Sequence, residues 1–344
     1  MTIPASQRKR PTQADVARLA AVSQPVVSYV LSGDPLAPVA PATRQRVLEA
    51  IAALGYVPDH AARSLRRRRT STIASVIPDI TNPFYPAFER GIQDVAEDAG
   101  YDLIAYNTDG KLERERKFLR SALAGRVDGI IVTPFHVSLS ECAGLVAQGI
   151  AVVALTSEQP PLADPPLDTL AIDGAAAARR AVTYLIDRGH RRIGMVAGEP
   201  GTPPREARVR GYVEALTERG LRVDQMLVRG ADFNEEGGYV AMQELLRLAN
   251  RPSAVFAAND LMAFGAMTAA REVGLRIPED VAIAGFDDIP AARLVQPPLT
   301  TVAQYPHRLG VRAAELLLER LRGAAPAWGR YELMPFDLIV RQSA

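Results

Sequence analysis

The sequence predicts a small all-α head followed by a two-lobed α/β body built on two doubly wound parallel sheets. Residues 12–58 contain three short amphipathic helical patterns with cap residues. From Thr72 onward, short apolar runs such as "TIASVIP" and "GIIVTP" alternate with longer amphipathic stretches such as "FERGIQDVAEDAG". Apolar strands that alternate with helices are typical of parallel sheets covered on both faces. The pattern occurs in two similar halves, about residues 72–168 and 169–297.

The head begins with two short helices that are joined by a tight turn. Thr12 can cap the first helix, with Asp15 three positions later, and Ser23 can cap the second. Thr43 can cap a third helix, "RQRVLEAIAAL", which Gly55 would end in the left-handed conformation. The spacing therefore predicts two crossed helices with a third packed against them.

The second helix of the head has the features of a helix that presents polar side chains to DNA. A helix-turn-helix sends its second helix into the major groove with its N-terminal residues facing the base edges. Proline is tolerated in the first helical turn, where no backbone donor is needed. The expected DNA-facing residues are Ser23, Gln24, Pro25, Ser28 and Tyr29. An ordinary helical hairpin explains the pattern equally well.

The charge of the chain is unevenly distributed. Residues 1–69 carry 11 Lys and Arg against 4 Asp and Glu, a net charge of +7. Residues 70–344 carry 29 against 35, a net charge of −6. A small basic head on an acidic body indicates a nucleic-acid-binding module joined to a domain with another role.

Several classes of protein are excluded or disfavoured by what the sequence lacks. The single cysteine, Cys142, rules out an internal disulfide framework and a cysteine-rich metal site. No run of 18 apolar residues occurs, and the basic N-terminus has no apolar core behind it, so we expect a cytoplasmic protein without a membrane span. We find no Gly-x-Ser-x-Gly, no Walker loop, no dinucleotide fingerprint and no His/Cys cluster, which argues against an enzyme and against a bound cofactor.

Motifs along the whole chain resemble the lactose/galactose-repressor (LacI/GalR) family of bacterial transcription regulators. They include "ADVARLAAVSQPVVSYVLSG", "VIPDITNPFY", "RVDGIIVTP", "AANDLMAFGAM", "REVGLRIPEDVAIAGFDD" and "PPLTTVAQ", and the likeness covers residues 12–344. The resemblance implies a helix-turn-helix head on a periplasmic-binding-protein-like effector domain. It also implies a homodimer that binds a palindromic operator in double-stranded DNA and responds to a small-molecule effector.

The resemblance divides the chain into four expected regions. These are a disordered basic arm (1–11), the DNA-binding head (12–58), a hinge helix with its linker (59–70) and the effector domain (71–344). The first lobe is expected to comprise about residues 71–168 and 299–329, and the second about 169–298 and 330–344.

The head departs from the family pattern at Ala21, at Val26, which stands where the family usually has a threonine, and at Tyr29. Ala21 stands where the family usually has a turn glycine, which would cost about 1 kcal/mol if that residue is left-handed. Tyr29 stands where the family usually has an arginine able to bind guanine. DNA binding is still expected, but a typical family operator is not.

By the same resemblance, "HAARSL" is a hinge helix that inserts its leucine into a minor-groove base step. Leu65 matches that position, with Arg63 and Arg66 beside it for phosphate contacts. A helix of about seven residues is too short to be stable alone. We therefore expect it to form only on DNA and only in a dimer.

The effector site is expected in the cleft at the carboxyl ends of the strands of both lobes. Residues that follow strands, together with the family motifs, give the candidates. They are Asp79, Asn82, Phe84, Tyr85 and Thr133 in the first lobe, and Arg208, Phe233, Asn259 and Asp287 in the second.

These candidates suit a polyol, because arginine donates through a fork, aspartate accepts from adjacent hydroxyls and an amide does both. The combination of Arg208, Asn259 and Asp287 also resembles the sugar-responsive members of the family more than the purine-responsive ones, and this resemblance favours a sugar as the effector. A purine or nucleoside is the alternative, since its base would also stack on the phenylalanines. A periplasmic-type sugar-binding protein would share the body but would need an export signal and no basic head.

Overall fold

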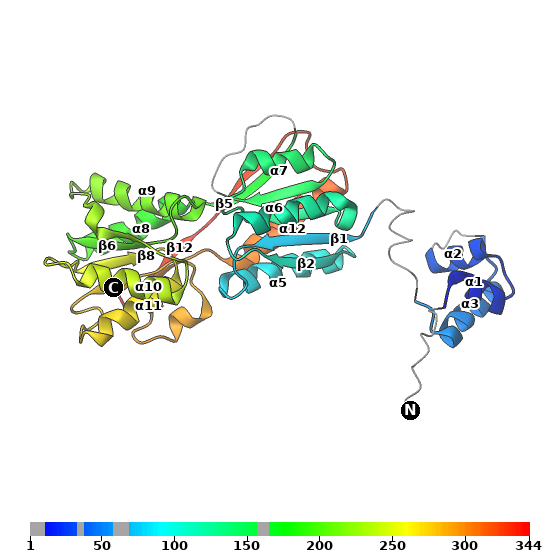
Figure 1. Ribbon diagram of the computed structural model, residues 1–344, viewed down its shortest axis with the longest axis horizontal. Helices are drawn as coiled ribbons and strands as arrows, with labels where there is room; N and C mark the ends of the chain where they lie inside the picture. The colour runs from blue at the N-terminus through cyan, green and yellow to red at the C-terminus, as the bar shows by residue number, and fades with distance from the viewer. Residues whose placement is uncertain (1–10, 33–37, 58–68, 157–164) are drawn as a thin grey trace, which may run out of the picture. The chain divides into compact units, whose positions relative to one another are not determined.

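The computed structural model of the chain describes residues 11–32, 38–57, 69–156 and 165–344. It divides into two compact units, Met1–Thr70 and Ser71–Ala344, called here the head and the body (Figure 1). The expected basic arm and most of the expected hinge segment, with Arg63, Leu65 and Arg66, lie outside the described residues. In the described ranges, no helix combines the length and the apolar character needed to cross a membrane.

The described part of the head is a bundle of three helices. They are α1 (Gln13–Leu19), α2 (Gln24–Ser32) and α3 (Pro41–Leu54). Val16, Val27 and Val47, one from each helix, are fully buried at its centre. The predicted capping box is confirmed, since the Asp15 backbone N–H donates to Thr12 Oγ1 at 3.3 Å and the Thr12 N–H donates to Asp15 Oδ2 at 2.9 Å.

The prediction that Thr43 caps the third helix is wrong. Helix α3 begins at Pro41, three residues before the expected Arg44, and Ala40 is its N-cap without a side-chain hydrogen bond. Proline is preorganised for the first helical position and needs no donor there, so it can begin a helix without a polar cap. The other end is as predicted, because Gly55 has φ 60° and ends the helix in the left-handed conformation.

The turn between α1 and α2 contains a left-handed alanine. Ala21 has φ 52° and is exposed. Left-handed backbone brings Cβ close to the following carbonyl oxygen, at a cost of about 1–2 kcal/mol for a residue with a Cβ. We therefore expect Ala21→Gly to stabilise the head by about 1 kcal/mol, which thermal unfolding of the head would show as a rise of several degrees in its Tm.

A matched control for this substitution lies in α3. Ala53 is exposed in the last turn of α3, and Ala53→Gly should lower the Tm of the head slightly, because glycine has a lower helix propensity than alanine. A fall in Tm for both variants would contradict the account of Ala21.

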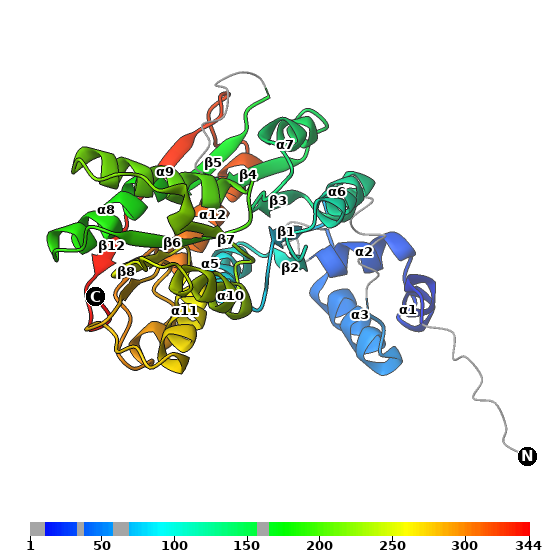
Figure 2. The same ribbon diagram turned by 60° about the vertical axis from the view of Figure 1, so that its left-hand side comes forward.

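The first lobe of the body is a six-stranded parallel sheet with helices on both faces (Figures 1 and 2). Its strands, in order across the sheet, are β11 (Tyr331–Met334), β5 (Asp168–Ile172), β4 (Ala151–Leu155), β3 (Gly129–Val132), β1 (Thr72–Ile77) and β2 (Asp102–Asn107). One face packs on α5 (Phe84–Asp98) and α12 (Pro306–Leu321), and the other on α6 (Leu112–Ser121) and α7 (Leu139–Val146). A π-helical turn, Ala122–Arg126, follows α6.

The second lobe is a four-stranded parallel sheet, also covered on both faces. Its strands, in order, are β7 (Val228–Gly230), β6 (Ile193–Ala197), β8 (Ala254–Ala257) and β9 (Ala282–Ala284). The helices are α8 (Gly174–Asp187) and α9 (Pro203–Glu218) on one face and α10 (Glu235–Leu246) and α11 (Asp260–Glu272) on the other. The strands β10 (Thr301–Ala303) and β12 (Asp337–Ile339) form an antiparallel ribbon beside β9, and short 3₁₀ turns lie at Gln225–Leu227 and Pro290–Arg293.

The expected lobe boundaries differ from the structure at both ends. Strand β5 belongs to the first sheet, so the first lobe extends to Ile172 rather than to residue 168. Strand β10 lies with the second lobe, and the chain returns to the first lobe only at α12. The segment "GRYELMPFDLIV" forms two strands, β11 and β12, in different sheets, because Pro335 between them cannot donate to a ladder.

Candidate functional site

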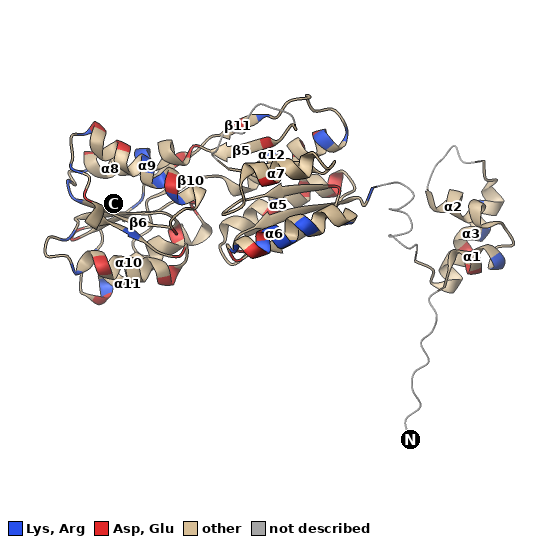
Figure 3. Ribbon diagram, turned by 45° about the horizontal axis from the view of Figure 1, so that its top comes forward, with Lys and Arg blue, Asp and Glu red and all other residues tan. Residues whose placement is uncertain are grey.

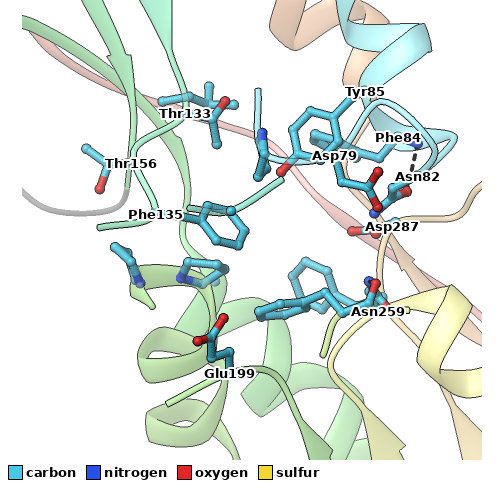
Figure 4. A pocket seen from close by; sticks show the side chains of 18 of the residues that line it. Asp79, Asn82, Phe84, Tyr85, Thr133, Phe135, Thr156, Glu199, Asn259 and Asp287 are labelled. Atoms are coloured by element: carbon cyan, nitrogen blue, oxygen red, sulfur yellow. Dashed lines mark hydrogen bonds between the residues drawn. The ribbon is translucent and has the colours of Figure 1, made fainter. Parts of the chain in front are cut away.

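A cavity of about 580 Å³ lies between the two lobes, where strands of both sheets end (Figure 4). Its walls include all nine residues that the sequence predicted for an effector site: Asp79, Asn82, Phe84, Tyr85, Thr133, Arg208, Phe233, Asn259 and Asp287. A cavity of this size, with apolar walls and a few convergent polar groups, is typical of a small-molecule site.

The first-lobe wall is formed largely by the segment between β1 and α5. Asp79 Oδ1 accepts hydrogen bonds from the Thr81 backbone N–H at 2.9 Å and from its hydroxyl at 2.7 Å. Asn82 Oδ1 accepts from the backbone N–H of Phe84 at 3.0 Å, which holds the turn into α5. Phe84 and Tyr85 meet edge to face, with ring centroids 5.1 Å apart. These contacts fix the polar groups before any ligand arrives.

Arg208 on α9 is a buried cation with unused donors. Its Nη1 donates to the Ala258 carbonyl at 2.6 Å, and its Cζ lies 4.0 Å from the centroid of the Phe286 ring. Its Nη2 is 3.9 Å from Asp287 Oδ1, which is an ion pair but too long for a hydrogen bond. Burial lowers the pKa of Arg208, although an arginine stays charged at neutral pH. The remaining guanidinium donors make no hydrogen bond to the described residues and are available to a ligand.

Asp287 is the buried carboxylate opposite Arg208. It accepts a hydrogen bond from Gln304 Nε2 at 2.5 Å, and the Asn82 amide of the other lobe lies close enough to stabilise its charge. Burial raises the pKa of Asp287 to about 6, although Arg208 and these two amides act in the opposite direction. Its φ is 120°, a conformation that side-chain-bearing residues rarely adopt. Strain of this kind is concentrated at functional sites.

A hydrogen bond from the Asn259 side chain holds the backbone of Phe233 in place. Asn259 Oδ1 caps α11 by accepting from the Met262 N–H at 2.8 Å, and its Nδ2 donates to the Phe233 carbonyl at 2.9 Å. A Cβ at Gly198 would lie 1.8 Å from the Phe233 ring, so only glycine leaves room for that ring. Asn259 therefore orients Phe233 as well as lining the cavity.

Several lining residues were missed by the sequence analysis. Phe135 stands in the middle of the cavity in Figure 4, and its ring centroid is 5.8 Å from that of Phe233 in the opposite lobe. Phe286 and Gln304 support Arg208 and Asp287. Phe135 follows β3 and Gln304 follows β10, so the rule that selected the other candidates could have found both.

Thr133, one of the predicted residues, carries an unused polar group. Its Oγ1 is buried and has no hydrogen-bond partner among the described residues. A buried hydroxyl without a partner costs free energy, so a ligand that bonds to it gains affinity.

In the head, the structure places the predicted DNA-facing side chains on one element. Ser23, Gln24 and Pro25 are exposed at the start of α2, Tyr29 is 48% exposed, and Ser28 is half-buried. Helix α2 has no Lys, Arg, Asp or Glu (Figure 3). Charge contacts with DNA phosphates would therefore come from other parts of the head, such as Arg44 and Arg46 on α3.

Two family models match the chain. Residues 12–59 match the bacterial regulatory proteins of the lacI family, and residues 182–344 match the periplasmic binding protein-like domain. The repressor CytR of Escherichia coli K12 is 36% identical over 341 residues, which are 98% of this chain and 97% of that protein. Catabolite control protein A of Priestia megaterium is 38% identical over 304 residues, covering 88% and 90%.

Solved structures agree with these matches. The regulator CelR in complex with cellobiose is 33% identical, with a TM-score of 0.73 over 97% of this chain and all of that one. The Lac repressor dimer bound to operator and an anti-inducer is 26% identical, with a TM-score of 0.85 over 97% and 99%. The predicted fold class is confirmed. The chain belongs to the lacI family of bacterial regulatory proteins, which are DNA-binding repressors controlled by effectors and are not enzymes.

Proposed function

We propose that this chain is a dimeric repressor that binds a palindromic operator and whose operator binding is controlled by a sugar held between its lobes. The observation that carries the sugar proposal is the buried pair Arg208 and Asp287, 3.9 Å apart, with unused guanidinium donors. A fork of donors facing a carboxylate can bind adjacent hydroxyls of one ring, with each hydroxyl acting as donor and acceptor. Phe135 and Phe233 supply apolar faces for the ring.

Similar proteins of known structure support a sugar. The regulator CelR was solved in complex with cellobiose. A lacI-family regulator from Enterococcus faecium, 31% identical to this chain with a TM-score of 0.71, was solved with bound ribose. A purine or nucleoside is the second candidate, favoured by the aromatic pair across the cavity, which could part to hold a planar base.

A thermal-shift screen tests the effector class. Neutral sugars, glycosides, nucleobases and nucleosides are added separately to the purified protein, because a ligand that binds only the native state raises the Tm. Hits are then tested for a change in operator affinity. A shift only with nucleobases or nucleosides would reject the sugar.

Contacts between the lobes suggest how an effector acts. Asn82 and Phe135 of the first lobe meet Asp287 and Phe233 of the second across the cavity. A ligand that enters between them would change the separation of the lobes. In the proposed mechanism this alters how the first lobes of two subunits pair, and so whether the two hinge segments can fold together on DNA.

Exposed apolar residues favour a homodimer. Ile104 lies on the edge strand β2, and Leu294, which is 78% exposed, follows the 3₁₀ turn in the second lobe. Strand β2 and helix α11 lie along the same lower edge of the body in Figures 1 and 2. A second copy packed along this edge would cover both lobes.

The proposed hinge wedge predicts a difference between operator and random DNA. Leu65→Ala should weaken operator binding at least tenfold, since burying a leucine is worth roughly 1.5–3 kcal/mol. Binding to random DNA should weaken less than threefold, because it depends on phosphate contacts. Titration of both DNAs at one salt concentration measures the two losses, and equal losses would argue against the wedge.

The pKa of Asp287, about 6, predicts how effector affinity depends on pH. The ligand needs the ionised carboxylate as acceptor, so protons compete with it. Between pH 7.5 and pH 5 the affinity should fall about tenfold. Calorimetric titration at several pH values measures how the effector affinity depends on pH. The Asp287→Asn variant should bind the effector weakly, with an affinity that does not change over this pH range. A pH-independent affinity in the unmodified chain would refute the role of Asp287.

A further inference from the structure

The ionisable side chains that line the cavity are mostly acidic. The acids are Asp79, Asp109, Glu199, Asp232 and Asp287, and the bases are Lys111 and Arg208. The two buried groups, Arg208 and Asp287, face each other. Asp109 is paired with Arg114, which lies outside the lining. The acids that remain are Asp79, Glu199 and Asp232, and Lys111 is the one base that remains. The lining of the cavity therefore has an excess of negative charge.

The acids occupy both ends of the cavity. Figure 4 shows Asp79 on the same side as Asp287, Asn82 and Asn259, whereas Glu199 lies at the opposite wall below Phe135. Glu199 and Asp232 follow the strands β6 and β7, are exposed, and form no ion pair within the described residues. A ligand therefore meets carboxylates at the outer edge and again at the inner end.

Two further ionisable groups lie at the inner end, and burial is the main cause of their raised pKa values. Asp260 lies fully buried behind Asp287, and its pKa is raised by burial and by that neighbouring carboxylate. The pKa of Tyr85 is raised by burial, then by Asp287 and Asp79, with only Arg208 acting against them. An added anion at this end would be repelled by Asp79, which forms no ion pair with the described residues, whereas the charges of Asp287 and Arg208 offset each other.

The helix N-termini around the cavity would ordinarily be good sites for a phosphate. Here the chain's own oxygens occupy them. Asn82 accepts from the first turn of α5, Asn234 from that of α10 and Asn259 from that of α11. At α9, Glu206 accepts from the Gly201 N–H, and acids stand in the first turns of α6 and α10. An incoming phosphate would have to displace these groups.

We propose that the cavity is an electrostatic filter, in which Glu199 and Asp232 at the outer edge and Asp79 within admit uncharged polyols and reject their phosphate and carboxylate derivatives. This inference rests on the proposed effector site and narrows the chemical class of its ligand. Low-dielectric walls lined by one sign of charge strengthen such discrimination, and salt weakens it.

The test compares matched pairs of ligands by calorimetry on the full chain. The pairs are glucose and glucose 6-phosphate, ribose and ribose 5-phosphate, cellobiose and cellobionic acid, and adenosine and its monophosphate. In each pair that binds, we expect the neutral form to bind at least tenfold more tightly at low salt, with a smaller ratio at 0.5 M salt. An anionic form that binds equally or more tightly would overturn the filter and leave the sugar proposal standing. If no sugar binds and adenosine binds more tightly than its monophosphate, the sugar proposal is refuted and the electrostatic filter is supported.

A double variant assigns the effect to the outer acids. In Glu199→Gln/Asp232→Asn the ratio of neutral to anionic affinity should fall at least threefold. The control, Asp187→Asn/Glu214→Gln, removes the same charge at an exposed and a half-exposed position that do not line the cavity, and should leave the ratio unchanged. An equal change in both variants would show that net charge, and not the cavity wall, sets the preference.

Discussion

Replacing Arg208 by alanine should weaken effector binding at least a hundredfold and abolish the effector response, while operator binding survives. The guanidinium is buried, and its free donors face the cavity beside Asp287. A hydrogen bond to a charged group contributes about 1.5–3 kcal/mol, so the loss of two corresponds to at least a hundredfold in affinity. Calorimetry with the effector, and operator titration with and without it, measure the two results.

The Arg208→Ala variant also leaves Asp287 buried without its cation, so the melting temperature must be measured alongside affinity. Arg208→Lys keeps the charge but not the fork, and should bind the effector with intermediate affinity. Arg210→Ala is the control on the same helix, because Arg210 is 58% exposed and its ion pair with Glu214 is 4.0 Å long. An unchanged dose–response in a folded Arg208→Ala protein would remove this residue from the site.

The head shows why local sequence signals were sufficient for much of the fold. Cap residues and helical spacing act within one or two turns, so the capping box at Thr12 and the left-handed Gly55 could be recognised directly. The start of α3 was missed because a polar cap at Thr43 was preferred over Pro41 at the first helical position. A polar cap and a proline at the first position are both common at helix N-termini. The structure shows that the proline is used here, with Ala40 as the N-cap.

The boundaries of the lobes depend on long-range pairing, which the sequence does not display. Strand β5 begins with the charged Asp168, and it is held in the first sheet by β4 and by β11, more than 150 residues later. Periodicity within the segment gives no sign of that partner. The separation of β11 and β12 into different sheets at Pro335 likewise depends on distant partners.

The cavity was predicted well because it follows a topological rule, whereas its charge balance was not foreseen. Residues after parallel strands converge at one edge, and this rule together with the family motifs selected nine candidates that line the cavity; Arg208, inside α9, came from its motif. Glu199 and Asp232 also follow strands, but nothing in their local sequence indicates that they face the cavity from two neighbouring strands. Their contribution to ligand selection is visible only once the two lobes are placed together.

The buried carboxylate of Asp168 joins three distant segments of the body. It is fully buried and accepts from Arg320 Nε and Nη2 at 2.8 and 2.7 Å, and from Arg330 N and Nη2 at 2.8 Å each. Burial by itself would raise the pKa of Asp168, but the hydrogen bonds from both arginines outweigh it and lower the pKa. The charge is thus compensated only as long as all three residues are present.

We therefore expect Asp168→Ala to destabilise the body by about 3–5 kcal/mol. It removes the carboxylate that pairs with the largely buried Arg320, for which the described residues offer no other, and one of the two that pair with Arg330, which keeps Glu319. Urea unfolding followed by circular dichroism and by the fluorescence of Trp328, the single tryptophan, measures the loss, since Arg320 Nη2 also donates to the Trp328 carbonyl at 2.6 Å. Asp187→Ala is the control, as Asp187 is 53% exposed and pairs with Arg219 at the surface, where such a pair contributes less than about 1 kcal/mol. Because β5 leads through Ile172 to α8 across the cavity, loosening it should also weaken effector binding. Equal, small losses in both variants would mean that β5 is held by its strand pairing and apolar contacts alone.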